Sequence, residues 1–98
     1  MENKTSVKNK FLISGESMSP LIRKGARVLV DTKKDKPGLG DVVMFIKDAR
    51  TTVHRIVEVE KDLVVTKGDN SLNKDSPIRF SQIIGVIKEV EYKNTKMD

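Results

Sequence analysis

Cysteine and tryptophan are absent from this 98-residue sequence, and histidine occurs only once. A chain of this composition cannot form a disulfide, a zinc site with thiolate ligands or a cluster of histidine ligands. We therefore expect neither a metal ion nor an organic cofactor.

Long apolar runs are also missing. A membrane-spanning helix needs about 18 or more consecutive apolar residues, whereas the longest run here extends only from Val42 to Ile46. The first ten residues lack the apolar segment of a signal peptide. These absences predict a soluble, cytoplasmic protein, which would meet a membrane only by peripheral contact or through an anchor outside this chain.

Aromatic residues are scarce, so the stacking side chains of proteins that bind single-stranded nucleic acid are missing. The aromatic residues are Phe11, Phe45, Phe80 and Tyr92. The net charge of +5 arises in residues 1–50, which carry 11 Lys/Arg and 6 Asp/Glu, against 8 and 8 in residues 51–98. A basic β-barrel that binds nucleic acid, with an affinity that falls steeply with salt, is one alternative. No recognition motif supports it, so we expect no nucleic-acid partner.

Short apolar runs rich in Val and Ile, bounded by Gly, Pro, Asn and Asp, predict an all-β fold. The predicted strands span residues 10–14, 26–32, 41–48, 51–60, 62–67 and 83–92. The length allows a single domain with a small core. We place this core at residues 10–92, between a flexible basic tail at 1–9 and a flexible tail at 93–98.

Turn signals join several of these strands into consecutive antiparallel pairs. Asp48-Ala49-Arg50 and Glu60-Lys61-Asp62 predict two tight turns on either side of strand 51–60. Alternation within that strand places His54 on the same face as Ile56. At most one short helical turn is expected, at 20–24, because proline suits a first helical position and Gly25 can end the turn.

Three polar segments are not explained by the strand pattern. In the first, residues 14–20, Gly15 lets the chain turn sharply and approach another backbone closely, and Pro20 fixes the exit. Ser17 would then lie on a tight turn directly after a strand. Such a turn can present a hydroxyl together with amide N–H groups, as acyl transfer requires, although an ordinary serine-rich loop fits the same residues.

The other two segments carry a candidate base and candidate acids. His54 has the only side chain whose ordinary pKa, about 6.5, suits a general base near neutral pH. Residues 66–77 contain Asp69 and Asp75, and one of these carboxylates could orient the imidazole. Taken separately, a satisfied or solvent-facing histidine and an ordinary polar turn are the favoured explanations of these residues.

In their order and spacing, the segments resemble the signal peptidase and LexA-type (S24/S26) serine peptidase superfamily. The matching motifs are Ser17-Met18-Ser19-Pro20 with Gly25-Ala26-Arg27-Val28-Leu29-Val30, Gly40-Asp41-Val42-Val43-Met44-Phe45, Val53-His54-Arg55-Ile56-Val57, and Thr66-Lys67-Gly68-Asp69-Asn70 with Asp75. The resemblance covers about residues 11–88. It implies a small coiled β-sheet or partly open barrel, present here as the catalytic core alone.

The resemblance also implies roles for individual residues. Endoplasmic-reticulum, archaeal and sporulation-type signal peptidases carry histidine as the base, whereas the main bacterial type and LexA-like repressors carry lysine. Ser17 is thus implied as the nucleophile, His54 as the base and Asp75 as the orienting acid, with Asp69 supporting the loop. Asp69 as the acid and Lys67 as the base are the alternatives within the family.

One departure from the family pattern lies beside the nucleophile. Many signal peptidases place a serine two residues before it, where this chain has Gly15, with Ser14 one step further back. We therefore expect the oxyanion donors to be backbone N–H groups, including that of Ser17, with Met18 supporting the turn.

The resulting expectation is a serine endopeptidase that cleaves a peptide or protein precursor bound as an extended strand beside residues 10–14. Signal peptidases usually carry a membrane anchor, which this chain lacks, so its substrate class stays open. The alternative is a non-catalytic peptide-binding module that keeps the fold, in which Ser17 and His54 would lie too far apart to interact.

Overall fold

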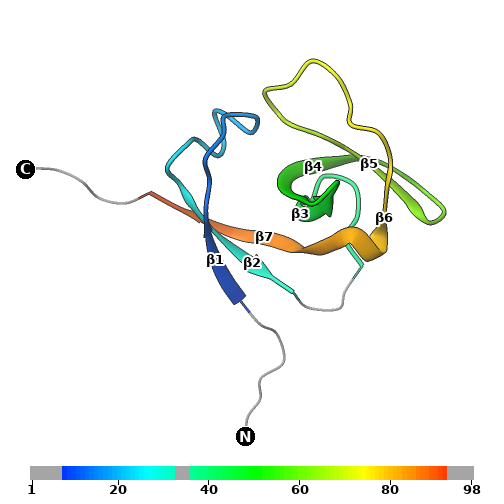
Figure 1. The fold of residues 1–98 in the computed structure, drawn as a ribbon, viewed down its shortest axis with the longest axis horizontal. Helices are drawn as coiled ribbons and strands as arrows, with labels where there is room; N and C mark the ends of the chain where they lie inside the picture. Colours follow the sequence, from blue (N-terminus) through cyan, green and yellow to red (C-terminus); the bar gives the residue numbers. More distant parts are fainter. Residues whose placement is uncertain (1–7, 33–35, 93–98) are drawn as a thin grey trace, which may run out of the picture.

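The computed structural model describes residues 8–32 and 36–92, in which a single antiparallel sheet confirms the all-β prediction (Figure 1). Its elements are β1 (Lys8–Leu12), β2 (Arg27–Asp31), β3 (Val42–Lys47), β4 (Arg50–Glu60), β5 (Leu63–Lys67), β6 (Ile78–Arg79), the 3₁₀ helix η1 (Phe80–Gln82) and β7 (Ile83–Glu91). The strand order is β1-β2-β7-β3-β4-β5-β6. The sheet stays open, with β1 and β6 at its two edges.

Strand β3 is the centre of the core because both of its faces are covered. Val42 and Met44 join one buried cluster, whereas Val43 and Phe45 join a second on the opposite face. The first cluster also contains Met18, Ile22, Ala26, Val28 and Val30, and the second contains Ile56, Val64 and Ile78. A strand covered on both faces requires a continuous apolar run in place of alternation, and the run from Val42 to Phe45 provides it, whereas Ile46 is exposed.

Two tight turns fix the register of β4 against its neighbours. Lys47 pairs with Arg50, so Asp48 and Ala49 alone form the loop, with φ values of 52° and 63° as a type I′ turn requires. At the other end of β4, Glu60 pairs with Leu63 around a second two-residue loop. Both turns lie where the sequence predicts them.

The predicted helical turn at 20–24 is wrong. The chain makes turns over residues 17–21, with one backbone bond from the N–H of Ile22 to the carbonyl of Met18. Gly25 then takes a φ of 94° and donates its N–H to Ile13, which directs the chain into β2 before a helix can continue. Within the described residues, the helical segment is η1 instead.

The ends of the chain agree only in part with the predicted boundaries. The expected tails at 1–9 and 93–98 lie mostly outside the described residues, but β1 already begins at Lys8, so residues 8 and 9 belong to the sheet. Strand β6, which spans two residues, was not predicted because so short a segment shows no alternation.

The register of β4 against β5 brings the functional loops together. Arg55 pairs with Lys67, so the loop after β5 leaves the sheet directly beside His54. A bulge between Ile56 and Glu58 bends β4 just beyond this point. In Figure 1 the loop after β1 and the loop between β5 and β6 rise on the same side of the sheet, and the N–H of Asn70 donates to the carbonyl of Ser17.

Candidate active site

Ser17, His54 and Asp75 form a continuous chain of contacts through the two ring nitrogens of the histidine. Nε2 of His54 lies 3.1 Å from Oγ of Ser17, and Nδ1 lies 2.5 Å from Oδ2 of Asp75. The imidazole is 11% exposed and the Asp75 side chain 28% exposed. The ring is further held by an edge contact with Phe45, with ring centroids 6.1 Å apart. This proximity does not fit the non-catalytic alternative, which requires separated side chains.

The turn that carries Ser17 is held by two buried side chains that anchor it to the sheet and by hydrogen bonds from Asn70. Met18 and Ile22 are almost fully buried in the first cluster, so they anchor the turn to the sheet. From the side, the N–H of Asn70 donates to the Ser17 carbonyl over 2.7 Å, and its side-chain amide donates to the Glu16 carbonyl over 3.1 Å. Asn70 therefore holds two consecutive carbonyls of the turn, a function that sequence reasoning did not assign to it.

Asp75 is held by Thr66, at the end of β5. The Thr66 hydroxyl donates to Oδ2 of Asp75 over 2.7 Å, and the backbone N–H of Asp75 donates to the Thr66 carbonyl over 2.8 Å. Thr66 is completely buried. A fully buried hydroxyl in a strand needs a hydrogen-bond partner, and here the partner is the carboxylate that contacts the histidine.

Asp69 faces a different partner, because Arg55 and His54 project from opposite faces of β4. The Arg55 guanidinium binds both carboxylate oxygens of Asp69, with Nε–Oδ1 and Nη2–Oδ2 distances of 2.9 and 2.8 Å. Its third contact is to the carbonyl of Gly40, over 2.8 Å. Lys67, the alternative base, directs its Nζ to the Gly68 carbonyl. The structure thus places Asp75 against His54 and Asp69 in the support of the loop.

Gly68 makes the close backbone approach that the sequence analysis assigned to Gly15. A Cβ at position 68 would lie 2.6 Å from the Ser17 carbonyl oxygen and 3.1 Å from Nε2 of His54. A Cβ at Gly15 would meet no atom within 4 Å, and its φ lies outside the left-handed region. The expectation for Gly15 is therefore wrong, because the loop of residues 68–71 approaches the turn from the side rather than crossing it at Gly15.

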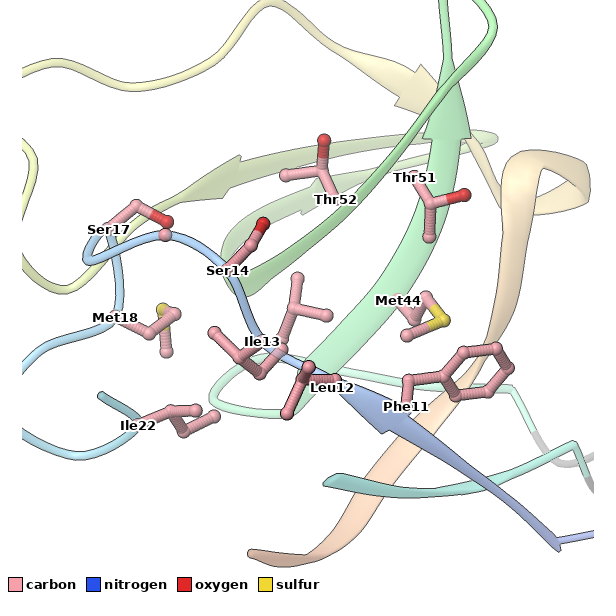
Figure 2. Close-up of a pocket in the computed structure, with 12 residues that line it drawn as sticks. Phe11, Leu12, Ile13, Ser14, Ser17, Met18, Ile22, Met44, Thr51 and Thr52 are labelled. Carbon is pink, nitrogen blue, oxygen red and sulfur yellow. The ribbon is translucent and has the colours of Figure 1, made fainter. Parts of the chain in front are cut away.

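An apolar cavity of about 400 Å³ opens beside Ser17. Figure 2 shows Ser17 and Ser14 at one end of this cavity, with Phe11 and Met44 toward the other end. Met18 and Ile13 contribute to its wall. Among the described residues, the backbone N–H of Ser17 has no hydrogen-bond acceptor, so it is free to donate to a bound group. The cavity therefore joins a hydroxyl, a free N–H and an apolar wall.

Metal ligation and membrane crossing find no support in the described part of the chain. Residues 8–32 and 36–92 contain no group of three or more His, Asp or Glu side chains placed to hold a metal ion. None of the helical segments described has the length and apolar character needed to cross a membrane.

The Peptidase S24-like family matches residues 9–88, which is most of the chain. This chain belongs to the Peptidase S24-like family. The match extends from β1 to the middle of β7, so it includes every residue of the Ser17–His54–Asp75 chain of contacts.

Two curated relatives carry the name signal peptidase complex catalytic subunit SEC11. The protein from Yarrowia lipolytica is 32% identical, over 79% of this chain and 53% of the relative. The protein from Lodderomyces elongisporus is 30% identical, over 89% of this chain and 51% of the relative. This Peptidase S24-like chain therefore spans about half the length of the curated relatives that it matches.

The ion pair between Arg55 and Asp69 should make the stability of this Peptidase S24-like domain depend on pH. Hydrogen bonds from Arg55 lower the pKa of Asp69, and the same bonds raise the pKa of Arg55. A carboxyl whose pKa is lowered on folding stabilises the native state above its ordinary pKa, and this contribution is lost as the pH falls through the lowered value.

We expect Asp69→Asn to lower the free energy of unfolding by about 1 kcal/mol at pH 7, because the pair is bidentate but partly exposed. The difference from the parent should begin to shrink below about pH 4, where the carboxyl of the unfolded chain becomes protonated, and should vanish once the pH falls through the lowered native pKa of Asp69. Urea unfolding from pH 7 to pH 2.5 measures it. Asp62→Asn, in the exposed turn after β4, is the control; a difference for Asp69→Asn that persists unchanged at pH 2.5 would refute the ion-pair origin.

The close approach of Gly68 to the Ser17 carbonyl predicts that a larger residue at position 68 destabilises the fold. Gly68→Ala places a methyl group against a backbone carbonyl that cannot move without shifting the Ser17 turn. We expect the free energy of unfolding to fall by about 1–3 kcal/mol, the usual cost of overpacking. Gly38→Ala is the matched control, because a Cβ there would meet no atom within 4 Å. Equal urea midpoints for the two variants would contradict the packing described here.

Proposed function

We propose that this chain is a serine endopeptidase in which Ser17 is the nucleophile, His54 the general base and Asp75 the acid that orients the imidazole. The observation that carries the proposal is that opposite ring nitrogens of His54 contact Ser17 and Asp75, over 3.1 and 2.5 Å. This arrangement suits a base that holds its own proton on Nδ1 and accepts a second proton on Nε2.

The proposed reaction begins with attack by Ser17 Oγ on the carbonyl carbon of a peptide bond. His54 Nε2 accepts the hydroxyl proton as the C–O bond forms, and the negative charge of Asp75 stabilises the resulting imidazolium. The oxyanion lies against the free backbone N–H of Ser17. His54 then donates its proton to the leaving amine as the C–N bond breaks. Water, deprotonated by the same imidazole, hydrolyses the acyl-enzyme and restores Ser17.

The proposed substrate is a segment of a peptide or protein precursor in an extended conformation. Strand β1 is an edge of the sheet, so its outer side can pair with an added strand through main-chain hydrogen bonds. The apolar cavity beside Ser17 would receive a side chain on the acyl side of the cleaved bond. The name of the two SEC11 relatives, signal peptidase complex catalytic subunit, supports a peptidase that acts on a precursor.

The test is incubation of the chain with a library of peptides derived from digested proteins, followed by mass spectrometry of new termini. Cleavage at a restricted set of sequences is the expected result. Ser17→Ala protein, incubated in parallel, identifies termini that arise from contaminating peptidases. If the two proteins produce the same termini, the endopeptidase proposal fails and a peptide-binding module becomes the better description.

A further inference from the structure

Two depressions meet at the candidate active site, and they differ in which reacting residue they contain. The apolar cavity is lined by Ser17 but does not include His54 or Asp75. A second depression, also of about 400 Å³, includes His54 and Asp75 but not Ser17. We call the second one the charged groove, because Lys47, Asp48 and Arg50 line its outer part.

The proposed chemistry indicates which part of the substrate would occupy each of these two depressions. The acyl part of a substrate stays bonded to Ser17, whereas the leaving amine must accept its proton from His54. The leaving segment therefore departs on the histidine side. Because the apolar cavity contains Ser17 and the charged groove contains His54, the leaving segment enters the charged groove.

The outer part of the groove holds an unfavourable pair of like charges. Lys47 and Arg50 are direct cross-strand partners that close the β3–β4 hairpin, and like charges placed opposite each other destabilise a sheet. Lys47 is partly engaged, because its ammonium contacts the side chain and the carbonyl of Ser76. The Arg50 guanidinium has no hydrogen-bond or ion-pair partner within the described chain.

The negative charges in the groove do not neutralise these two cations. Asp75 is bound to His54 and Thr66 at the inner end, so it is not available to the hairpin. Asp48, in the turn itself, supplies one negative charge against the positive charges of Lys47 and Arg50. The outer part of the charged groove therefore keeps one net positive charge and an unpaired guanidinium.

We propose that the outer part of the charged groove binds a carboxylate of the leaving segment, an inference that rests on the proposed endopeptidase function. Arg50 lies four positions before His54 on β4, which corresponds to about 13 Å along an extended strand. An extended leaving segment covers this distance with about four residues. The groove thus selects a substrate with an Asp or Glu side chain, or a free chain terminus, at the third or fourth position after the cleaved bond.

The first experiment measures selectivity with a peptide cleaved in the library. Versions with Glu, Gln or Lys at the third and fourth positions after the cleaved bond are compared by kcat/KM. Two further versions end at this position, one with a C-terminal amide and one with a free acid, and they separate a terminal carboxylate from a side chain. We expect the Glu peptide to be favoured over the Gln peptide by about three- to tenfold at low salt.

Arg50→Gln should reduce this Glu-to-Gln ratio to about one, and Arg50→Glu should invert it in favour of the Lys peptide. The matched control is Lys61→Gln, which removes the same charge from the tip of the β4–β5 hairpin and should keep the parent ratio. A parent enzyme that cleaves all versions equally, or a ratio that is the same in Arg50→Gln and the parent, overturns the proposal.

A second measurement is independent of catalysis. Short peptides that mimic a free leaving segment, with a single Glu or Gln at the third or fourth residue, are titrated into isotope-labelled Ser17→Ala protein and followed by NMR. We expect shifts of amides at 47–52 for the Glu peptides only, abolished in the Ser17→Ala/Arg50→Gln double variant. Such shifts without any cleavage by the parent would remove the endopeptidase proposal but keep the carboxylate site, whereas cleavage without charge-dependent shifts or rates would remove the site alone.

Discussion

Replacing Ser17 with alanine is expected to reduce cleavage by about 10⁴-fold or more, because it removes the hydroxyl that contacts His54 Nε2 and would form the acyl-enzyme. Within the described chain, the Ser17 side chain bonds only to His54, and the residue is exposed. Loss of its hydroxyl should therefore change the free energy of unfolding by less than about 0.5 kcal/mol. The readouts are the cleavage rate of a library-derived peptide and the urea midpoint.

The matched control is Ser81→Ala, an exposed serine of η1 whose side chain makes no hydrogen bond to Ser17, His54 or Asp75. It should cleave at the parent rate. A Ser17→Ala protein that keeps the urea midpoint and also keeps a tenth or more of the cleavage rate would remove Ser17 from the mechanism. Loss of cleavage together with a lowered midpoint would instead show a structural role, and Ser17→Thr, which keeps a hydroxyl, then separates the two roles.

The second large effect is expected for Asp75→Asn, which should reduce kcat/KM by about 10²–10⁴-fold. An asparagine can place its Oδ1 where Oδ2 now accepts from His54 and Thr66, so both hydrogen bonds can persist. What it cannot supply is the negative charge that stabilises the imidazolium during proton transfer. The measurement is kcat/KM for a library-derived peptide, and the urea midpoint verifies folding.

Asp69→Asn is the natural comparison, because the two carboxylates lie in the same loop but contact different residues, Arg55 and His54. The Asp69 carboxylate is bound by Arg55 and does not contact the imidazole. We expect its replacement to reduce kcat/KM by less than about tenfold, through loosening of the loop alone. A larger loss for Asp69→Asn than for Asp75→Asn, at equal folded fractions, would reverse the assignment of the acid.

The fold could be predicted where the sequence carries a repeating pattern or a turn that only certain residues allow. The apolar run of β3 and the alternation in β4 locate both strands, and Asp48 with Ala49 locates the hairpin between them. The ends of β1 could not be placed, because its pairing with β2 begins at Lys8 and continues through the bond from the Ile13 N–H to Ala26 before the chains separate. Strand ends of this kind depend on tertiary contacts rather than on local residues.

The sequence predicts which residues form the candidate site, but it does not predict all of the contacts between them. Residues alone leave open which carboxylate in residues 66–77 faces His54, and the resemblance, through the spacing from Gly68-Asp69-Asn70, implies Asp75 with Asp69 as the alternative. The decision lies in side-chain parity on β4, where Arg55 faces away from His54 and engages Asp69. The supporting contacts of Thr66, Gly68 and Asn70 depend on how the loop folds back, which no local pattern encodes.

The double attachment of Asp75 to Thr66 has a consequence for how such a domain can diversify. One backbone bond and one side-chain bond join Asp75 to Thr66 at the base of the loop. These two bonds hold the Asp75 carboxylate independently of the conformation of the residues between Asn70 and Asp75. Leu72, at the crest of this excursion, is 97% exposed. Insertions and deletions near Leu72 should therefore leave the Ser17–His54–Asp75 contacts in place. New recognition surfaces could evolve there without disturbing the candidate active site.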